Sequence, residues 1–331
     1  MKQGFPEVSN YKVMVQCITY NQSKYIEETL KGFAMQNTDF SFICCVFDDA
    51  STDGEQDVLK RWIENHCKAE EVEIFDHPLT IIYIAPDKDN PNCIYAIHLQ
   101  KVNTWGKPEK REMIAYWEKQ CEYEALCEGD DYWIDPLKLQ KQVNFMDTNP
   151  DYSMCFHKSS VIREYEDEHR SIVKLFGNIK EGEYTGIEIL EDWIVPTASV
   201  IFRKKTVEIT RNANFIYGDI VVFLSCANFG RIYCLGDTMS VYRRNISGIS
   251  NSSINFDKLI KHYDTILYSF GEKYKKTVIN IIAKIYVRKI ASDRSLNNIY
   301  ITLLDLLKTH PNSFFPFIKE IILTLKGKIM N

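Results

Sequence analysis

The centre of the sequence contains Glu124-Ala-Leu-Cys-Glu-Gly-Asp-Asp-Tyr-Trp133, in which an apolar segment runs directly into a cluster of carboxylates. Residues 125–127 are typical of the end of a short buried strand, and Glu128, Asp130 and Asp131 follow without a turn. Three carboxylates within four residues repel one another unless a cation lies among them. Hard oxygen ligands suit Mg²⁺ or Mn²⁺, especially when a bound diphosphate adds ligands. The stretch therefore predicts a metal site at a strand end, against the alternative of a solvated acidic turn.

The residues after this stretch are expected to form a helix. Asp135 offers an N-cap, and Pro136 suits the first helical position. Leu139, Val143 and Met146 then recur at helical spacing and predict a buried stripe.

The composition is that of a folded protein. The 331 residues are 45% hydrophobic and 13% aromatic, which suits one large or two ordinary domains. The net charge of −5 gives no attraction to nucleic acid, so no such partner is expected. The ten cysteines include no C-x-x-C pair, and Cys17, Cys44 and Cys45 lie in apolar segments typical of buried thiols. A signal-peptide pattern and an uncharged apolar run of roughly 18 residues are both missing, so we expect a cytoplasmic protein.

The first third of the chain alternates between strand and helix patterns. Strands are expected at residues 11–18, 41–47 and 79–85, and helices from Ile26 to Ala34 and from Glu55 to about His66. Continuous apolar strands in this order indicate a parallel sheet covered on both faces. Ligands of such sheets bind beyond the carboxyl ends of the strands. The polar clusters at 19–21, 48–49 and 128–131 all fall at such ends, and no dinucleotide-binding or P-loop glycine motif occurs.

Three segments then carry a family resemblance. They are Val15-Gln-Cys-Ile-Thr-Tyr-Asn-Gln-Ser-Lys-Tyr-Ile26, Val46-Phe-Asp-Asp-Ala-Ser-Thr-Asp-Gly54 and Leu126-Cys-Glu-Gly-Asp-Asp-Tyr-Trp-Ile-Asp-Pro-Leu-Lys-Leu-Gln-Lys-Gln142. In this order they resemble the family 2 glycosyltransferases, and more narrowly the bacterial branch that builds capsule, O-antigen or related surface polysaccharides. The resemblance covers roughly residues 10–250 and is weak between 86 and 122.

The resemblance implies a GT-A fold, with a mostly parallel central sheet flanked by helices, that uses a nucleotide-sugar and Mn²⁺ or Mg²⁺. The residues it places around the base and ribose are Thr19, Tyr20 and Asn21. Asp49 would accept a hydrogen bond from uracil N3–H, because an ionised carboxylate only accepts; the alternative for Asp48 and Asp49 is a helix cap.

For the acidic cluster, the resemblance implies that Asp130 and Asp131 divide the ribose and metal contacts between them, and it leaves the division open. Glu128 stands where many relatives carry aspartate, and would reach the ribose, or the metal through water.

The acceptor side is implied by the same resemblance. Trp193 and Thr197 become candidate acceptor contacts, against the alternative of a core tryptophan and a polar strand residue. Asp219 becomes the catalytic base that takes the proton of an acceptor hydroxyl, against the alternative of an N-cap. A single displacement would invert the anomeric carbon. His157, within an apolar strand, is interpreted as a core histidine.

The segment Ser240-Val-Tyr-Arg-Arg-Asn-Ile-Ser-Gly-Ile-Ser250 resembles the closing Y-R-x-H loop of the family. Asn245 stands in place of the histidine and is a weaker ligand for metal or diphosphate, for which Arg243 or Arg244 would compensate by pairing with phosphate. Residues 83–117 also depart from the family pattern, and we expect a substrate loop or a partner surface there.

Residues 256–331 form a separate block, predicted to be a helical extension of a 1–255 catalytic domain. The block carries a net charge of +7, whereas residues 1–255 carry −12. Its basic amphipathic helices suit an anionic membrane surface at the inner face of the cell membrane. The alternative is a helical subdomain packed on the catalytic domain or on a second subunit, as in a homodimer.

The leading hypothesis from the sequence is a metal-dependent, inverting hexosyl- or N-acetylhexosaminyltransferase, which moves a sugar from a UDP-sugar to a glycan or lipid-linked acceptor. A non-catalytic nucleotide- or sugar-binding partner that retains the fold is the alternative from another class. A nucleotidyltransferase of similar topology is a third reading, although the glycine-rich basic loop expected after its first strand is missing.

Overall fold

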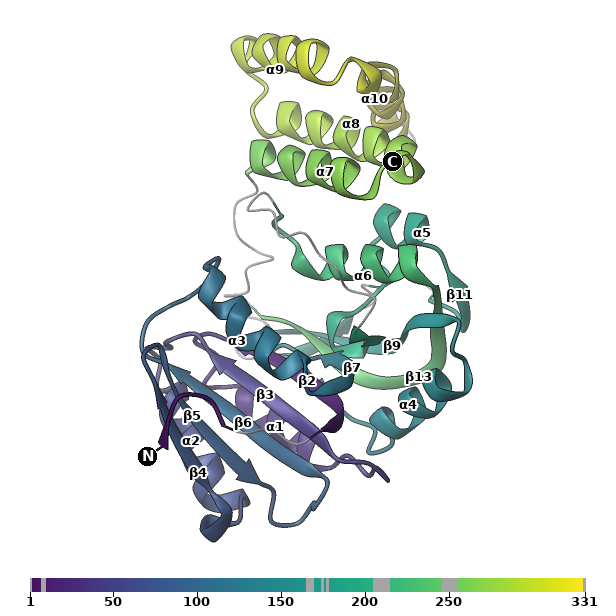
Figure 1. Cartoon of the computed structure of the whole chain (residues 1–331). Coiled ribbons are helices and arrows are strands. Elements are labelled where there is room, and N and C mark those ends of the chain that lie inside the picture. Colours follow the sequence, from purple (N-terminus) through teal and green to yellow (C-terminus); the bar gives the residue numbers. More distant parts are fainter. Residues whose placement is uncertain are drawn as a thin grey trace. The chain divides into compact units, whose positions relative to one another are not determined.

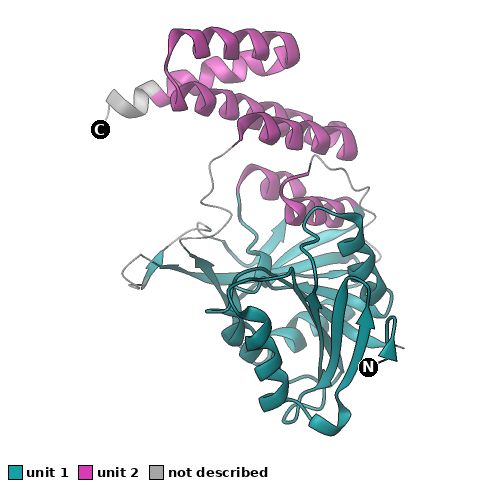
Figure 2. Ribbon diagram, turned by 90° about the vertical axis from the view of Figure 1, so that its left-hand side faces the viewer, with its two compact units in different colours: residues 1–185, 193–207, 229–249 teal, residues 186–192, 208–228, 250–331 magenta. Residues whose placement is uncertain are grey.

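The structure is a computed structural model that describes residues 2–6, 10–164, 170–173, 176, 179–204, 215–245 and 255–329 (Figure 1). The chain divides into two compact units, coloured separately in Figure 2. Unit 1 comprises residues 1–185, 193–207 and 229–249, and unit 2 comprises residues 186–192, 208–228 and 250–331. Unit 2 therefore contains the C-terminal block together with two segments from the earlier part of the chain.

Unit 1 is built on one sheet whose centre is parallel. The central strands are β2 (Tyr11–Thr19), β3 (Phe42–Asp48), β6 (Cys93–Gln100) and β7 (Cys121–Leu126), and they pair in the order β6-β3-β2-β7. Beyond β6 lie β5 (Thr80–Pro86), β4 (Glu73–His77) and β1 (Lys2–Gln3). Beyond β7 lie β12 (Ile201–Arg203), β9 (Tyr152–Glu164), β13 (Arg231–Arg244) and β11 (Gly182–Tyr184). Two further strands, β10 (Arg170–Val173) and β8 (Tyr132–Trp133), pair with β9 and β13.

Helices cover both faces of this sheet, as the continuous apolar strands predict. The helices on one face are α1 (Ile26–Ala34), α2 (Glu55–His66) and α4 (Lys138–Thr148), and α3 (Pro108–Glu118) lies on the other. All seven residues of β3 are buried as a result. Alternate residues of β3 face opposite layers, so that Cys44 packs with α1, α2 and α4, whereas Cys45 packs with α3.

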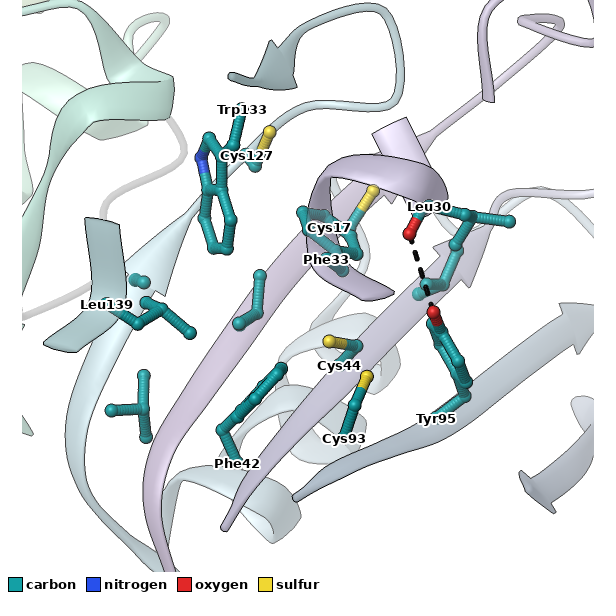
Figure 3. Packing of buried hydrophobic residues seen from close by; sticks show 14 of the residues in the cluster. Cys17, Leu30, Phe33, Phe42, Cys44, Cys93, Tyr95, Cys127, Trp133 and Leu139 are labelled. Carbon is teal, nitrogen blue, oxygen red and sulfur yellow. Dashed lines mark hydrogen bonds between the residues drawn. The ribbon is translucent and has the colours of Figure 1, made fainter. Parts of the chain in front are cut away.

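The core contains several free cysteines, as expected from their apolar surroundings. Figure 3 shows Cys17, Cys44, Cys93 and Cys127 among the packed side chains between the sheet and its helices. Burial raises the pKa of the Cys17 and Cys44 thiols well above the ordinary value. These thiols therefore act as small apolar side chains and not as nucleophiles.

Most of residues 83–117 form regular strands and a helix, so the expectation of a substrate loop is wrong for most of that segment. The predicted strand at 79–85 exists as β5, but it is antiparallel to its neighbour, and the third parallel strand is β6. Tyr95 and His98 of β6 are fully buried, and Trp117 of α3 donates a hydrogen bond of 2.7 Å from Nε1 to His98 Nε2. Tyr95 and Trp117 are therefore core residues, whereas Trp105 is 62% exposed.

The helix predicted after the central acidic stretch also forms, two residues later than expected. Asp135 Oδ1 accepts a hydrogen bond from the backbone N–H of Leu137 at 2.8 Å, and α4 then begins at Lys138. Leu139, Val143 and Met146 are buried, as the helical spacing predicts.

Unit 2 is helical throughout its described part. Its helices are α5 (Gly186–Glu191), α6 (Gly218–Phe229, the last residue of which belongs to unit 1), α7 (Phe256–Phe270), α8 (Lys275–Ser292), α9 (Leu296–Thr309) and α10 (Phe314–Ile329). They share one apolar core, centred on α8, which supplies Val278, Ile282 and Tyr286. The predicted C-terminal helices are confirmed.

Candidate functional site

The carboxyl ends of β2, β3 and β7 lie side by side and bring three polar segments together. Thr19 at the end of β2 is in register with Asp48 at the end of β3, and Gln16 with Leu126 of β7. Beyond the strands, Asp49 N–H donates to Thr19 O at 3.0 Å and Gly129 N–H donates to Ile18 O at 3.1 Å. The predicted convergence of these segments at one sheet edge is what the structure shows.

Glu55 lies at the end of the first acidic loop, residues 48–55, and accepts several hydrogen bonds there, although no sequence motif assigned it a role. Its carboxylate accepts hydrogen bonds from the hydroxyl of Thr19, from the backbone N–H of Gln22 at 2.8 Å and from Ser51 Oγ at 2.9 Å. The side chain is fully buried at the start of α2. Burial raises the pKa of Glu55 to about 7, despite these donors. Glu55 thus ties the end of β2 to the loop after β3.

The three residues expected around the base and ribose have different surroundings. Thr19 is buried in the contact with Glu55, and Tyr20 is 48% exposed. Asn21 has a positive φ of 54°, which asparagine tolerates better than most residues. Its N–H donates to Ser51 Oγ at 2.9 Å, and its Oδ1 accepts from Thr52 N–H at 2.7 Å. Tyr20 is the member of the trio whose ring is open to a ligand.

Asp49 is held by partners that the sequence did not indicate. Its Oδ1 accepts from the N–H and hydroxyl of Thr104 at 2.7 and 2.9 Å, and its Oδ2 lies 3.1 Å from Lys110 Nζ. The neighbouring Asp48 is fully buried, and its Oδ1 has no hydrogen-bond partner among the described residues. Burial raises the pKa of Asp48. Neither aspartate caps α2, because Asp53 Oδ1 accepts from the N–H of Glu55 at 3.1 Å.

The second acidic loop, residues 128–131, contacts the end of β13. Asp131 is 1% exposed, and its Oδ1 accepts from the backbone N–H of Arg243 at 2.8 Å. Asp130 is less buried, and its Oδ2 accepts from Asn245 Nδ2 at 2.7 Å. Burial raises the pKa of both carboxyls, and repulsion from Asp130 adds to the rise for Asp131. Glu128, at the start of the loop, is half-buried, and its carbonyl accepts from the N–H of Asp131 at 3.1 Å.

The Arg243 side chain is enclosed by protein groups. Its guanidinium donates from Nη1 to the carbonyl of Asp130 at 2.5 Å and from Nη2 to Glu28. It also lies 4.5 Å from the ring centroid of Tyr132 and 5.0 Å from that of Tyr25. Arg243 is 3% exposed, so its main contribution is to hold the second loop in place. Nε is buried and has no acceptor among the described residues.

The second acidic loop meets the end of β2 at Gly129. A side chain at this position would begin 2.6 Å from Thr19 Cβ and even closer to Thr19 Oγ1 and Gln22 Oε1. The space beside the glycine is therefore filled by the end of β2, and only glycine allows the second loop to come this close to Thr19 and Gln22.

Solved glycosyltransferases share this fold. The Staphylococcus aureus protein TarS, residues 1–349, in complex with UDP-GlcNAc superimposes with a TM-score of 0.54 at 18% identity, over 93% of this chain and 79% of TarS. The Pyrobaculum calidifontis mannosyltransferase PcManGT, in complex with GDP-Man and Mn²⁺, gives a TM-score of 0.52 at 15% identity, over 96% and 87%. Residues 15–80, which include β2 and the first acidic loop, match the family model of glycosyl transferase family 2. Over this segment the chain is similar to glycosyl transferase family 2.

The GT-A fold that the sequence implied is confirmed by these structural matches. Among curated proteins, it is 31% identical over 245 residues to uncharacterized proteins of Mycobacterium tuberculosis and Mycobacterium bovis. The matched region is 71% of this chain and 60% of the relatives, so the chain spans about 60% of their length.

The residues of the second acidic loop fit a divalent metal in part. Among the described residues, no group of three His, Cys, Asp or Glu side chains lies close enough to hold a metal ion. Asp130 and Asp131 are nevertheless two buried carboxyls whose raised pKa values reflect the cost of their charge, and a cation would offset that cost. A metal bound here would need further oxygen ligands from the diphosphate of a donor and from water.

The predicted acceptor residues are distributed over both units. Trp193 of unit 1 is 47% exposed, so the alternative of a core tryptophan is wrong, whereas Thr197 is 7% exposed. Asp219 belongs to unit 2, in the first turn of α6, where its Oδ1 accepts from the N–H of Ile220 at 2.9 Å. Arg244 is half-buried at the end of β13. The part of the Ser240–Ser250 segment after Asn245 lies outside the described residues.

His157 is a core histidine, as interpreted from the sequence. It is fully buried in β9, its Nδ1 lies 2.8 Å from the carbonyl of Lys158, and burial lowers its pKa well below the ordinary value. It is therefore neutral and contributes to packing.

Proposed function

We propose that this protein transfers a sugar from a nucleotide-sugar, most simply a UDP-sugar, to a hydroxyl of a glycan or lipid-linked acceptor. The supporting observation is the pair of acidic loops that this chain brings together at the ends of β2, β3 and β7. The relatives of similar fold are crystallised with UDP-GlcNAc or with GDP-Man and Mn²⁺, which agrees with nucleotide-sugar chemistry. The match to a glycosyltransferase family favours this reading over a nucleotidyltransferase.

The two carboxylates of the second loop would have separate roles. Asp130 is the less buried of the two and is our candidate for contact with the ribose and with Mn²⁺ or Mg²⁺. Asp131 is held by the backbone of Arg243, which suits a residue that shapes the loop and offers its second oxygen to the cation. The cation would supply positive charge beside the leaving diphosphate. Thr19, Tyr20, Asn21 and Asp49 remain the candidates for the nucleoside, with Tyr20 as the ring open to stacking.

The chemical step would be a single displacement with inversion. The acceptor oxygen forms a bond to the anomeric carbon, the bond from that carbon to the diphosphate breaks, and the bonding electron pair leaves with the diphosphate. Asp219 takes the proton of the acceptor hydroxyl, and Trp193 and Thr197 are candidates for holding the acceptor. Asn245 and the half-buried Arg244 would stabilise the departing phosphate.

Thermal shift with UDP, GDP, CMP and dTDP, each with and without Mn²⁺, tests the donor site. A nucleotide that binds only the folded chain raises the melting temperature by mass action. We expect a shift with UDP that grows with Mn²⁺ and that loses its Mn²⁺-dependent part in Asp130→Asn. Asp57→Asn, an exposed aspartate on α2, is the matched control and should keep it. An equal Mn²⁺ effect in Asp130→Asn would remove the proposed metal contact.

A non-catalytic binder is the second candidate, and two observations favour it. Asn245 replaces the histidine of the family pattern, and the described residues hold no three-ligand metal group. Donor hydrolysis in the absence of acceptor separates the two readings. We expect slow release of UDP from a UDP-sugar, and Asp219→Asn should bind UDP normally but lose transfer. Tight nucleotide binding without any turnover would establish the binder instead.

A further inference from the structure

Helix α10 of unit 2 is apolar on two sides. Phe317 faces the unit 2 core and is 1% exposed. On the outside, Phe315, Ile318, Ile322 and Leu323 are 81, 39, 47 and 52% exposed. Their spacing of three, seven and eight residues from Phe315 places them on one face of the helix. A group of large exposed apolar side chains on one helix face marks an interaction surface.

Helix α9 likewise has both a buried apolar residue and several exposed ones. Leu306 is fully buried in the unit 2 core, whereas Leu296, Tyr300, Ile301 and Leu307 are 85, 63, 53 and 49% exposed. Residues 296–323 thus hold eight of the 21 exposed large hydrophobic side chains of the described chain. Both helices pack on α8, and Figures 1 and 2 draw them on the far side of α8 from α7.

Among the described side chains of these two helices, the exposed charged residues are lysines. Lys308 and Lys319 are exposed, and Lys319 lies on the same face of α10 as Ile322. The two acidic residues are half-buried, and one of them, Asp305, accepts a hydrogen bond from the Tyr286 hydroxyl at 3.0 Å. Residues 256–331 carry a net charge of +7.

We propose that the outer face of α9 and α10, defined by the eight exposed apolar residues with Lys308 and Lys319, lies on an anionic lipid surface. Apolar side chains enter the boundary between headgroups and acyl chains, while lysines beside them pair with anionic headgroups. A symmetric contact with a second copy would bring lysine towards lysine, which charge disfavours. Among the described residues no helix is long and apolar enough to cross a bilayer, so the helices would lie in the interface.

The test is sedimentation of the full chain with vesicles of phosphatidylcholine alone or mixed with phosphatidylglycerol. We expect binding to the anionic vesicles that weakens with salt, and little binding to neutral ones. The double variant Phe315→Ser/Ile322→Ser should lower the partition onto anionic vesicles about tenfold or more, because it removes two of the inserted side chains. Lys308→Gln/Lys319→Gln should lower it by a similar factor and reduce its salt dependence.

Tyr268→Ser is the matched control, because Tyr268 is an 88% exposed apolar residue of α7 outside the proposed face. It should bind vesicles as the unchanged chain does. All variants should keep their melting temperature and their response to UDP, which separates this inference from the proposed function. Absence of vesicle binding would overturn the proposal, as would equal binding to both vesicle types. Self-association that Phe315→Ser/Ile322→Ser abolishes, without vesicle binding, would assign the face to a second copy.

Discussion

The two acidic loops of unit 1 differ in how much they depend on the later part of the chain. The loop at residues 48–55 is held by groups from the first 110 residues, namely hydroxyls, backbone N–H groups and one lysine. The loop at 128–131 accepts hydrogen bonds from the Thr29 hydroxyl of α1, and it is also held by Arg243 and Asn245, which lie 112–115 positions later in the sequence. The first loop is therefore complete once the amino-terminal strands have paired, whereas the second also requires β13 in place.

Because of this difference, the titration of the first loop and the positioning of the second loop can be altered separately. The first loop includes a buried carboxyl, that of Glu55, whose pKa is raised to about 7. The second includes two carboxyls whose positions depend on contacts with Arg243. Changes in β13 should thus disturb the loop that carries the metal candidates and leave the first loop intact.

The largest effect is expected for Arg243→Met. The variant removes a buried guanidinium that contacts the Asp130 carbonyl and Glu28 between two tyrosine rings. Breaking a buried charged contact costs about 3–5 kcal/mol. Urea unfolding should show a loss of that size, together with loss of any Mn²⁺-dependent UDP shift. Arg244→Met, at the next and half-buried position, should cost less than about 1 kcal/mol. Equal effects at the two positions would contradict the assigned role.

A smaller effect, seen as a pH dependence, is expected for Glu55. Because its folded pKa of about 7 lies above the ordinary 4.5, the folded state binds the proton more tightly than the unfolded state. Proton binding at Glu55 stabilises the folded state fully below pH 4.5. About 3 kcal/mol of this stabilisation is lost as the pH rises to 7. Glu55→Gln mimics the protonated form, so its stability relative to the unchanged chain should rise over this interval.

Denaturant unfolding between pH 4.5 and 8 measures this slope. Glu64→Gln, an exposed glutamate on the same helix, should follow the unchanged chain at every pH. A Glu55→Gln curve parallel to that of the unchanged chain would show that this carboxyl does not titrate differently on folding.

Much of the fold is predictable from the sequence, because β2, β3 and α2 have continuous apolar strands or a clear helical period. β6 escaped prediction, since Tyr95 and His98 look like surface residues until Trp117 of α3 supplies a partner for the histidine. The strand therefore depends on a tertiary contact that no local pattern contains.

The same limit applies to the site. The aspartates at 130 and 131 are visible as a motif, but the partners that determine their surroundings are not. Glu55 resembles an ordinary first-turn helix residue, and Thr104 lies in a loop whose approach to Asp49 depends on β6 being a central strand. From its residue type alone, Arg243 was interpreted as a phosphate ligand. That two tyrosine rings lie against its guanidinium becomes visible only in the folded structure.

Gly129→Ala tests the contact between the second loop and the end of β2. The new methyl group would overlap Thr19 and Gln22, and overpacking of this kind costs about 1–3 kcal/mol. Gly218→Ala is the control, because nothing lies within 4 Å of an added Cβ there. Melting temperatures should fall for the first variant and remain or rise slightly for the second. A fully stable Gly129→Ala would mean that the second loop can move away from β2 without cost.

The smallest effect is expected for Thr104→Val, which acts on the first loop alone. The substitution removes the hydroxyl from Asp49 Oδ1 but retains the backbone N–H donor and the nearby Lys110. Because the carboxylate keeps these partners, the loss should be about 1–2 kcal/mol in urea unfolding. Thr52→Val, at an exposed position of the same loop region, should change stability by less than about 0.5 kcal/mol. If the first loop is independent of β13, the costs of Thr104→Val and Arg243→Met should add in the double variant. A total that departs from the sum by more than about 0.5 kcal/mol would show that the two loops are coupled.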